Sequence, residues 1–128
     1  MQANFRTTLL LAALLGVTAV LTGTFGAHGL EGRVSNDLLG VYETGVRYHA
    51  YHALALLACC GFVDRLGRLG GWVVGLFAIG TVVFAGSLYL LALTGERWLG
   101  AITPIGGACF VAGWVCLAWS GLRAKVAN

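Results

Sequence analysis

Charged side chains are scarce in this sequence. Only 10% of the 128 residues are Asp, Glu, Lys or Arg, whereas 59% are hydrophobic and the mean hydropathy is +0.85. A water-soluble domain would carry roughly a quarter charged residues. The shortage of charge therefore argues against a soluble domain and predicts a protein of the lipid bilayer.

Several signatures of chemistry are missing as well. Neither an HExxH nor a GxSxG motif occurs, and Ser87 has no base that the sequence makes evident. The net charge of +3 is spread along the chain, without a basic patch outside the expected membrane rim, so nucleic-acid binding is not predicted. An intramembrane enzyme is therefore less favoured than a scaffold or a binder of a small ligand.

Long apolar runs are what the sequence has in abundance. Four stretches of 16–25 residues are close to the length that crosses about 30 Å of hydrocarbon as a helix. We predict one integral membrane domain over residues 1–128, all α, with four transmembrane helices. The expected spans are Thr7 to Phe25, Tyr48 to Val63, Leu69 to Leu93 and Trp98 to Gly121.

The connections between the runs indicate how the spans are arranged. Short polar links favour antiparallel neighbours, and so a four-helix antiparallel bundle. In the longer first link, apolar residues recur at helical spacing, which predicts a short amphipathic surface helix over Asn36 to Gly45. The first run follows Arg6 as in a signal peptide, but FGAHGLEG offers no convincing cleavage site, so we expect a retained helix.

The basic residues predict the orientation in the membrane, because cytoplasmic ends collect Lys and Arg. The side with both termini holds five of them, and the other side holds three, of which Arg47 is better described as embedded. We therefore expect both termini in the cytoplasm and, since nothing resembles a transit peptide, a location in the inner (plasma) membrane. The five residues are Arg6, Arg65, Arg68, Arg123 and Lys125.

Given this topology, the polar residues gather toward the non-cytoplasmic side. Ionisable groups within a membrane are costly, so such a cluster is where function is first sought. It forms our candidate site, for a ligand or for structure, with no catalytic residue assigned. Its members are His28, Glu43, Arg47, Tyr48, His49, His52, Ser87, Tyr89 and Thr103.

Each part of the cluster has two interpretations. Glu43 and Arg47 are four residues apart, the spacing of a helical ion pair, and can serve either as a structural clamp or in a substrate or proton role. Three histidines, His28, His49 and His52, can complete a metal site, although bonding to carbonyls or lipid headgroups is the commoner use of interfacial histidine. We assign no metal ligand, and the sequence does not identify a cofactor.

Small residues suggest close helix packing or oligomerisation. Ala12 with Gly16, Ala19 with Gly23, and the segment GWVVG from Gly71 to Gly75 follow the small-xxx-small pattern of helix contacts in membranes.

Four ordered motifs resemble those of a known family, the DUF423 (UPF0382) small membrane proteins, whose eukaryotic relatives are the transmembrane protein 256-like proteins. The resemblance covers nearly the whole chain and implies a multi-pass membrane protein without assigning a catalytic residue. The motifs are GTFGAHGL at Gly23 to Leu30, YETGVRYHAYHALALL at Tyr42 to Leu57, FAGSLYLLALTG at Phe84 to Gly95 and GAITPIGG at Gly100 to Gly107.

The sequence thus favours a small membrane protein without enzymatic activity, a scaffold or accessory subunit of a homo-oligomer or of a larger membrane complex. A pure packing subunit would have no need of the polar cluster. The alternative is therefore a binder or carrier of a small ligand, such as a lipid, quinone, metal or proton, at the cluster.

Overall fold

The computed structural model describes residues 3–123, and every regular element in that range is a helix. Four α-helices are joined by a π-helical turn and two short 3₁₀ segments. In chain order the elements are α1 (Phe5–Phe25), η1 (Gly26–Leu30), α2 (Asn36–Cys59), η2 (Val63–Leu66), α3 (Arg68–Thr94), η3 (Arg97–Ala101) and α4 (Thr103–Arg123).

Local side chains determine where the first helix begins. Asn4 Oδ1 accepts a hydrogen bond from the Thr7 N–H at 3.0 Å, and Thr7 Oγ1 accepts one from the Asn4 N–H at 3.3 Å, which is a capping box. Asp64 Oδ1 accepts from the Phe5 N–H at 3.3 Å, so a carboxylate of η2 satisfies another free donor at this helix end. The capping fixes the start of α1 beside η2.

The prediction of a separate surface helix over Asn36 to Gly45 is wrong. This segment is helical, but it is the first part of α2, which continues to Cys59 as one helix of 24 residues. Tyr42, Gly45 and His49 are buried at helical spacing on a single face. Because that face packs along its length, the backbone has no reason to break at Gly45.

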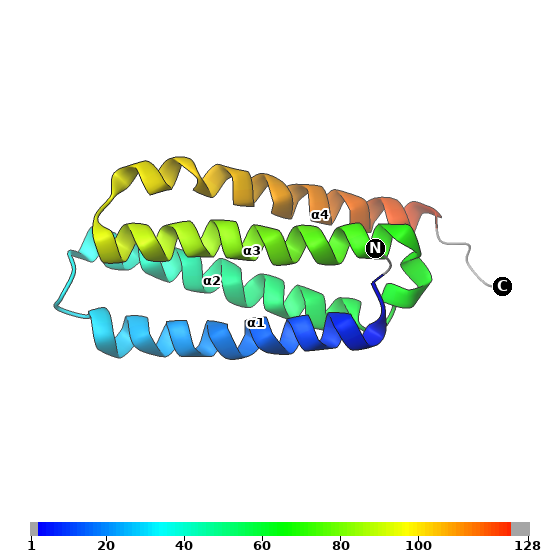
Figure 1. The fold of residues 1–128 in the computed structure, drawn as a ribbon, viewed down its shortest axis with the longest axis horizontal. Helices are drawn as coiled ribbons and strands as arrows, with labels where there is room; N and C mark the ends of the chain where they lie inside the picture. Colours follow the sequence, from blue (N-terminus) through cyan, green and yellow to red (C-terminus); the bar gives the residue numbers. More distant parts are fainter. Residues whose placement is uncertain (1–2, 124–128) are drawn as a thin grey trace.

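The four α-helices lie lengthwise side by side, and successive helices run in opposite directions (Figure 1). α2 contacts both α1 and α3, and α3 also contacts α4, so α2 and α3 lie between the outer helices. The start of α1 and the end of α4 lie at the same end of the molecule (Figure 1).

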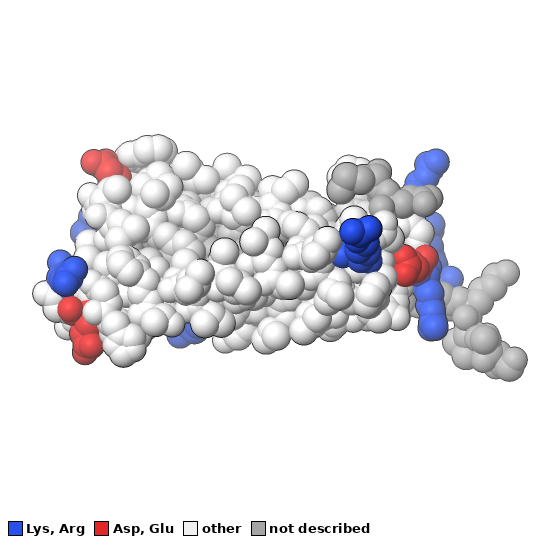
Figure 2. Space-filling model, turned by 60° about the horizontal axis from the view of Figure 1, so that its bottom comes forward, with Lys and Arg blue, Asp and Glu red and all other residues white. Residues whose placement is uncertain are grey.

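Three segments are long and apolar enough to cross a membrane by length and composition: Phe5–Leu30, Arg68–Thr94 and Arg97–Arg123. They include the first, third and fourth predicted spans. α2 does not meet this criterion, because Glu43, Arg47 and two histidines lower its hydropathy. On the face shown in Figure 2, most charged side chains lie toward the two ends, and one basic patch lies farther in, at the lower edge.

Glycines allow the closest helix contacts, although not all at the positions that the sequence suggested. A Cβ on Gly106 of α4 would lie 2.5 Å from the Phe84 backbone nitrogen of α3, and one on Gly113 would lie 2.6 Å from the Phe77 ring. By contrast, a Cβ on Gly16 or Gly75 would have nothing within 4 Å. The α3–α4 contact therefore depends on glycine, whereas the space beside Gly16 and Gly75 is open.

We expect Gly106→Ala to destabilise the fold by about 1–3 kcal/mol, because the added methyl group meets backbone that cannot move aside cheaply. The measurement is SDS-induced unfolding in mixed micelles. Gly86→Ala in α3 is the matched control, since a Cβ at Gly86 meets nothing within 4 Å. Equal stabilities of the two variants would contradict this account of the α3–α4 contact.

Candidate functional site

The structure divides the predicted polar cluster into four groups. One surrounds His49 between α1, α2 and α3, and a second surrounds His52 between α2 and α4. A third joins Ser87 to Thr103 between α3 and α4, and the fourth lies at the molecular surface. His49, His52 and Ser87 are buried, whereas His28, Glu43, Arg47 and Tyr48 are exposed.

His49 lies in a hydrogen-bonded chain that joins three helices. Its Nε2 is 3.2 Å from Thr18 Oγ1 on α1, and its Nδ1 is 3.1 Å from Tyr89 Oη on α3. Tyr89 Oη is also 3.2 Å from Thr22 Oγ1 on α1. Both ring nitrogens of His49 are therefore used within the protein.

Tyr42 completes this group from the side. Its hydroxyl donates to the Thr22 carbonyl at 2.9 Å, and its ring centroid lies 4.7 Å from that of Tyr89. A Cβ at Gly45 would come within 2.9 Å of the Tyr89 ring, so the absence of a side chain there allows Tyr89 to reach His49. The group connects α1, α2 and α3 through polar contacts.

His52 has a defined tautomer. Its Nδ1 is 2.9 Å from the Tyr48 carbonyl, which can only accept, so Nδ1 carries the proton. Its Nε2 accepts from the Trp114 indole N–H at 3.3 Å, since indole can only donate. The ring also stacks on Phe110, with centroids 3.5 Å apart. The neutral His52 ring thus joins α2 to α4.

Two other predicted residues join α3 to the start of α4. Ser87 Oγ donates to the Phe84 carbonyl at 3.0 Å, so the Thr103 hydroxyl is the donor in its 2.8 Å contact with Ser87. Tyr48 packs its ring 4.7 Å from that of Phe84. Within residues 3–123, every buried side-chain nitrogen or oxygen has a hydrogen-bond partner. The buried polar side chains are therefore satisfied within the protein.

Glu43 and Arg47 do not form the ion pair that their spacing suggested. Arg47 Nη2 donates to Thr44 Oγ1 at 3.1 Å, and the described part of the chain contains no ion pair between the two. Both instead line an open pocket of about 220 Å³, between the end of α1 and α2. Its lining residues are Gly23, Gly26, Ala27, Tyr42, Glu43, Val46 and Arg47.

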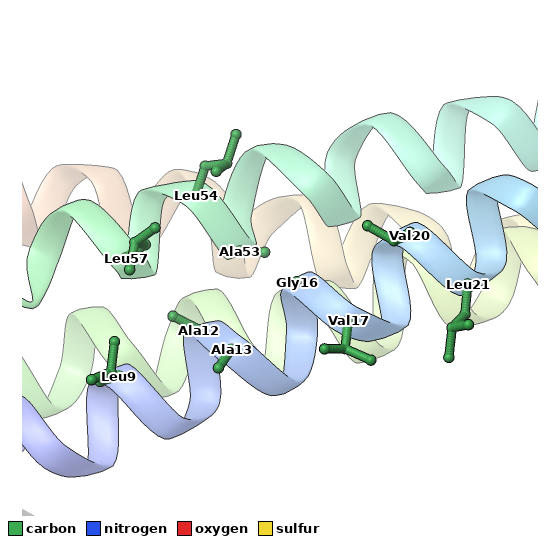
Figure 3. A pocket seen from close by; sticks show the side chains of 10 residues that line it. All are labelled: Leu9, Ala12, Ala13, Gly16, Val17, Val20, Leu21, Ala53, Leu54 and Leu57. Carbon is green, nitrogen blue, oxygen red and sulfur yellow. The ribbon is translucent and has the colours of Figure 1, made fainter.

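A larger groove, of about 550 Å³, lies between α1 and α2. It is lined only by apolar residues, and Figure 3 shows their side chains on neighbouring turns of the two helices. Four of them are alanine or glycine, which leaves the space open. The lining residues are Leu9, Ala12, Ala13, Gly16, Val17, Val20, Leu21, Ala53, Leu54 and Leu57.

The three histidines are not brought together. His28 is exposed on η1, His49 turns to α1 and α3, and His52 turns to α4. Among residues 3–123 there is no group of three His, Cys, Asp or Glu side chains that could hold a metal ion. The structure thus offers no support for the three-histidine arrangement.

Sequence reasoning did not include several partners in the buried network, above all Thr18, Thr22 and Trp114. Thr18 and Thr22 are four residues apart in an otherwise apolar run, which places them on one helix face. Threonines at such spacing could have been recognised as partners for polar residues of another span. For Trp114, which lies inside the predicted fourth span, the sequence leaves open whether it faces the interface or the other helices.

An all-helical fold in which three segments are long and apolar enough to cross a bilayer is typical of a membrane protein. Residues 22–107 match the family described as Protein of unknown function (DUF423), and the chain belongs to this family of membrane proteins.

Curated relatives support the assignment over most of the chain. The UPF0382 membrane protein YwdK of Bacillus subtilis (strain 168) is 42% identical, over 90% of this chain and 95% of its own. The UPF0382 membrane protein SSP2132 of Staphylococcus saprophyticus is 48% identical, over 85% and 91%. The UPF0382 inner membrane protein YgdD of Escherichia coli (strain K12) is 38% identical, over 91% and 90%. No solved structure is significantly similar to the chain.

The His52–Trp114 contact predicts a specific energetic coupling. His52→Phe and Trp114→Phe should each destabilise the protein by about 1–3 kcal/mol, because each leaves a polar group without its partner. The double variant should lose at least about 1 kcal/mol less free energy of unfolding than the two single variants lose together. SDS titration of the four proteins measures this cycle, and additive effects would show that the two side chains are not coupled.

Proposed function

We propose that this protein spans the inner membrane four times, with both termini in the cytoplasm, and binds a membrane lipid along the seam between α1 and α2. The observation that carries the proposal is that the apolar groove and the charged pocket follow the same seam.

α2 is the helix whose span most needs support, since its composition alone is not that of a membrane segment. Its 24 residues extend over about 36 Å as an α-helix, which exceeds the hydrocarbon thickness of about 30 Å. His49 and His52 are buried among neighbouring helices rather than facing lipid. A helix shielded in this way can cross a bilayer without exposing its polar groups.

The faces of both helices support one continuous binding seam. On α2, Glu43 and Arg47 of the pocket share a helix face with Leu54 and Leu57 of the groove, because their separations are close to whole numbers of turns. Ala50 lies on that face between them and is too small to divide it.

The same relation holds on α1. Leu9, Gly16 and Val20 of the groove share a face with Gly23 of the pocket. The groove extends along α1 from Leu9 to Leu21, which is about 18 Å at the rise of an α-helix. One leaflet of hydrocarbon is about 15 Å deep, half of the usual core thickness. The seam thus matches a lipid with its headgroup in the pocket and one acyl chain in the groove.

We expect Gly16→Leu to weaken lipid retention about tenfold. A leucine there would fill the groove and displace about two methylene groups of an acyl chain, each contributing about 0.8 kcal/mol. Native mass spectrometry of protein released from lipid nanodiscs measures the lipid that remains bound.

Gly86→Leu is the matched control for this test. Gly86 is also a helical glycine with open space around its Cβ position, but it lies on α3, outside the groove. We expect it to retain lipid as the unaltered protein does. Equal retention in Gly16→Leu and Gly86→Leu would exclude the groove as the lipid site.

A scaffold or accessory subunit is the second candidate function, and one face of α3 favours it. Trp72, Ile79 and Val82 are exposed on this face, and Gly75 and Gly86 on the same face have nothing within 4 Å of their Cβ positions. Small residues beside exposed apolar ones allow a helix of another subunit to approach closely.

The scaffold function predicts the opposite pattern of effects. Gly86→Leu, but not Gly16→Leu, should abolish a disulfide cross-link formed in native membranes through cysteine at Val82. The cross-linked product is measured on non-reducing gels, in a background in which the four native cysteines are serine. A cross-link unaffected by Gly86→Leu would count against α3 as the assembly face.

A further inference from the structure

We propose that the charged pocket between α1 and α2 recognises a phosphoethanolamine group, as carried by the zwitterionic lipid phosphatidylethanolamine. This inference rests on the proposed lipid-binding function and names the headgroup that the seam selects. In the proposed complex, Arg47 binds the phosphate of the headgroup and Glu43 binds its primary ammonium group.

The first support is that the two charges remain available. Glu43 and Arg47 are four residues apart on α2, with the acidic residue first, which is the favourable order for a direct pair. Yet Arg47 donates to Thr44 Oγ1, and the described residues provide no hydrogen bond to the Glu43 carboxylate. Glu43 and Arg47 therefore both line the pocket, and their charged groups do not satisfy each other.

The second support is the shape of the pocket. Its volume of about 220 Å³ is below the roughly 300–1,000 Å³ of sites for drug-sized ligands, so it suits a small polar group rather than a whole lipid. A Cβ at Gly26 would come within 2.7 Å of the Tyr42 ring, so this glycine allows the ring to lie against η1. The Tyr42 hydroxyl is bonded to the Thr22 carbonyl, which fixes the ring as a wall.

The chemistry of the two charged groups determines which headgroup fits. A guanidinium binds a phosphate through paired charge-assisted hydrogen bonds. A carboxylate accepts hydrogen bonds from a primary ammonium, which has three donors, whereas the trimethylammonium of phosphatidylcholine has none. Phosphatidylglycerol offers a phosphate but no cation for Glu43. Only phosphoethanolamine satisfies both side chains among these three common headgroups.

The position of the pocket fits a headgroup as well. Glu43 lies seven residues into α2, about 10 Å along the helix axis from its start. In the proposed topology the pocket therefore lies toward the non-cytoplasmic end of the α1–α2 seam. The apolar groove continues from the pocket toward the cytoplasmic side, so a bound headgroup would direct its acyl chain into the groove.

The test uses nanodiscs containing equal amounts of phosphatidylethanolamine, phosphatidylcholine and phosphatidylglycerol with matched acyl chains. Native mass spectrometry then reports which lipid the released protein retains. We expect retention of phosphatidylethanolamine over the other two by about tenfold, a size typical of one charge-assisted hydrogen bond. Glu43→Gln should abolish the preference over phosphatidylglycerol, and Arg47→Gln should weaken retention of all three.

Glu31→Gln and Arg33→Gln are the matched controls. These exposed residues of the loop between η1 and α2 carry the same charges as Glu43 and Arg47 but do not line the pocket. Both should keep the preference. If Glu43→Gln also keeps it, or if the unaltered protein has no preference, the headgroup assignment is overturned. The lipid-binding function fails separately, if Gly16→Leu does not reduce retention of any lipid.

A further arm distinguishes a lipid headgroup from the free compound. Soluble O-phosphoethanolamine is titrated against protein in phosphatidylcholine nanodiscs and in nanodiscs with phosphatidylethanolamine. The soluble compound should bind in phosphatidylcholine nanodiscs and be excluded when phosphatidylethanolamine is present. This result would support the lipid headgroup as the ligand of the pocket. Equal binding in both would assign the pocket to a free metabolite and overturn the lipid assignment.

Discussion

Polar groups taken into an apolar membrane must find their partners within the protein, and this requirement organises the structure. Water cannot bond to a buried imidazole or hydroxyl in hydrocarbon, so each unsatisfied group would cost several kcal/mol. α2 carries the largest share of such groups. His49 is satisfied by α1 and α3, and His52 is satisfied by α4 and by its own helix. The position of α2 between its neighbours follows from that need.

The same requirement separates the residues that hold the fold together from those that remain available. The two buried histidines have no free ring nitrogen, so they serve the packing of the helices. Glu43 and Arg47 are exposed, and both residues line an open pocket. Chemistry with an external molecule is therefore more readily assigned to this exposed pair than to the histidines.

Glycine has two uses in this chain. Gly45 and Gly106 admit a ring and a backbone of the neighbouring helix, so the contacts of α2 and α4 with α3 depend on them. Gly16 and Gly86 have no such contact and face open space. Small residues with no function in internal packing leave room on the surface of the molecule, either for a lipid chain or for another helix.

Composition and hydrophobic runs determined the class of protein and three helices long and apolar enough to span a membrane, because these depend on length and apolar content. Ordered motifs determined the family, because they are local in sequence. The sequence also placed His49, His52, Ser87 and Tyr89 among the polar residues of interest. It could not determine that Asn36 to Cys59 forms one helix, since the continuity of α2 comes from packing along its whole buried face. Nor could it show that Glu43 and Arg47 do not pair, or that Thr18, Thr22 and Trp114 complete the network. Those partners lie between 31 and 67 residues apart in the chain, so only the tertiary structure decides which side chains meet.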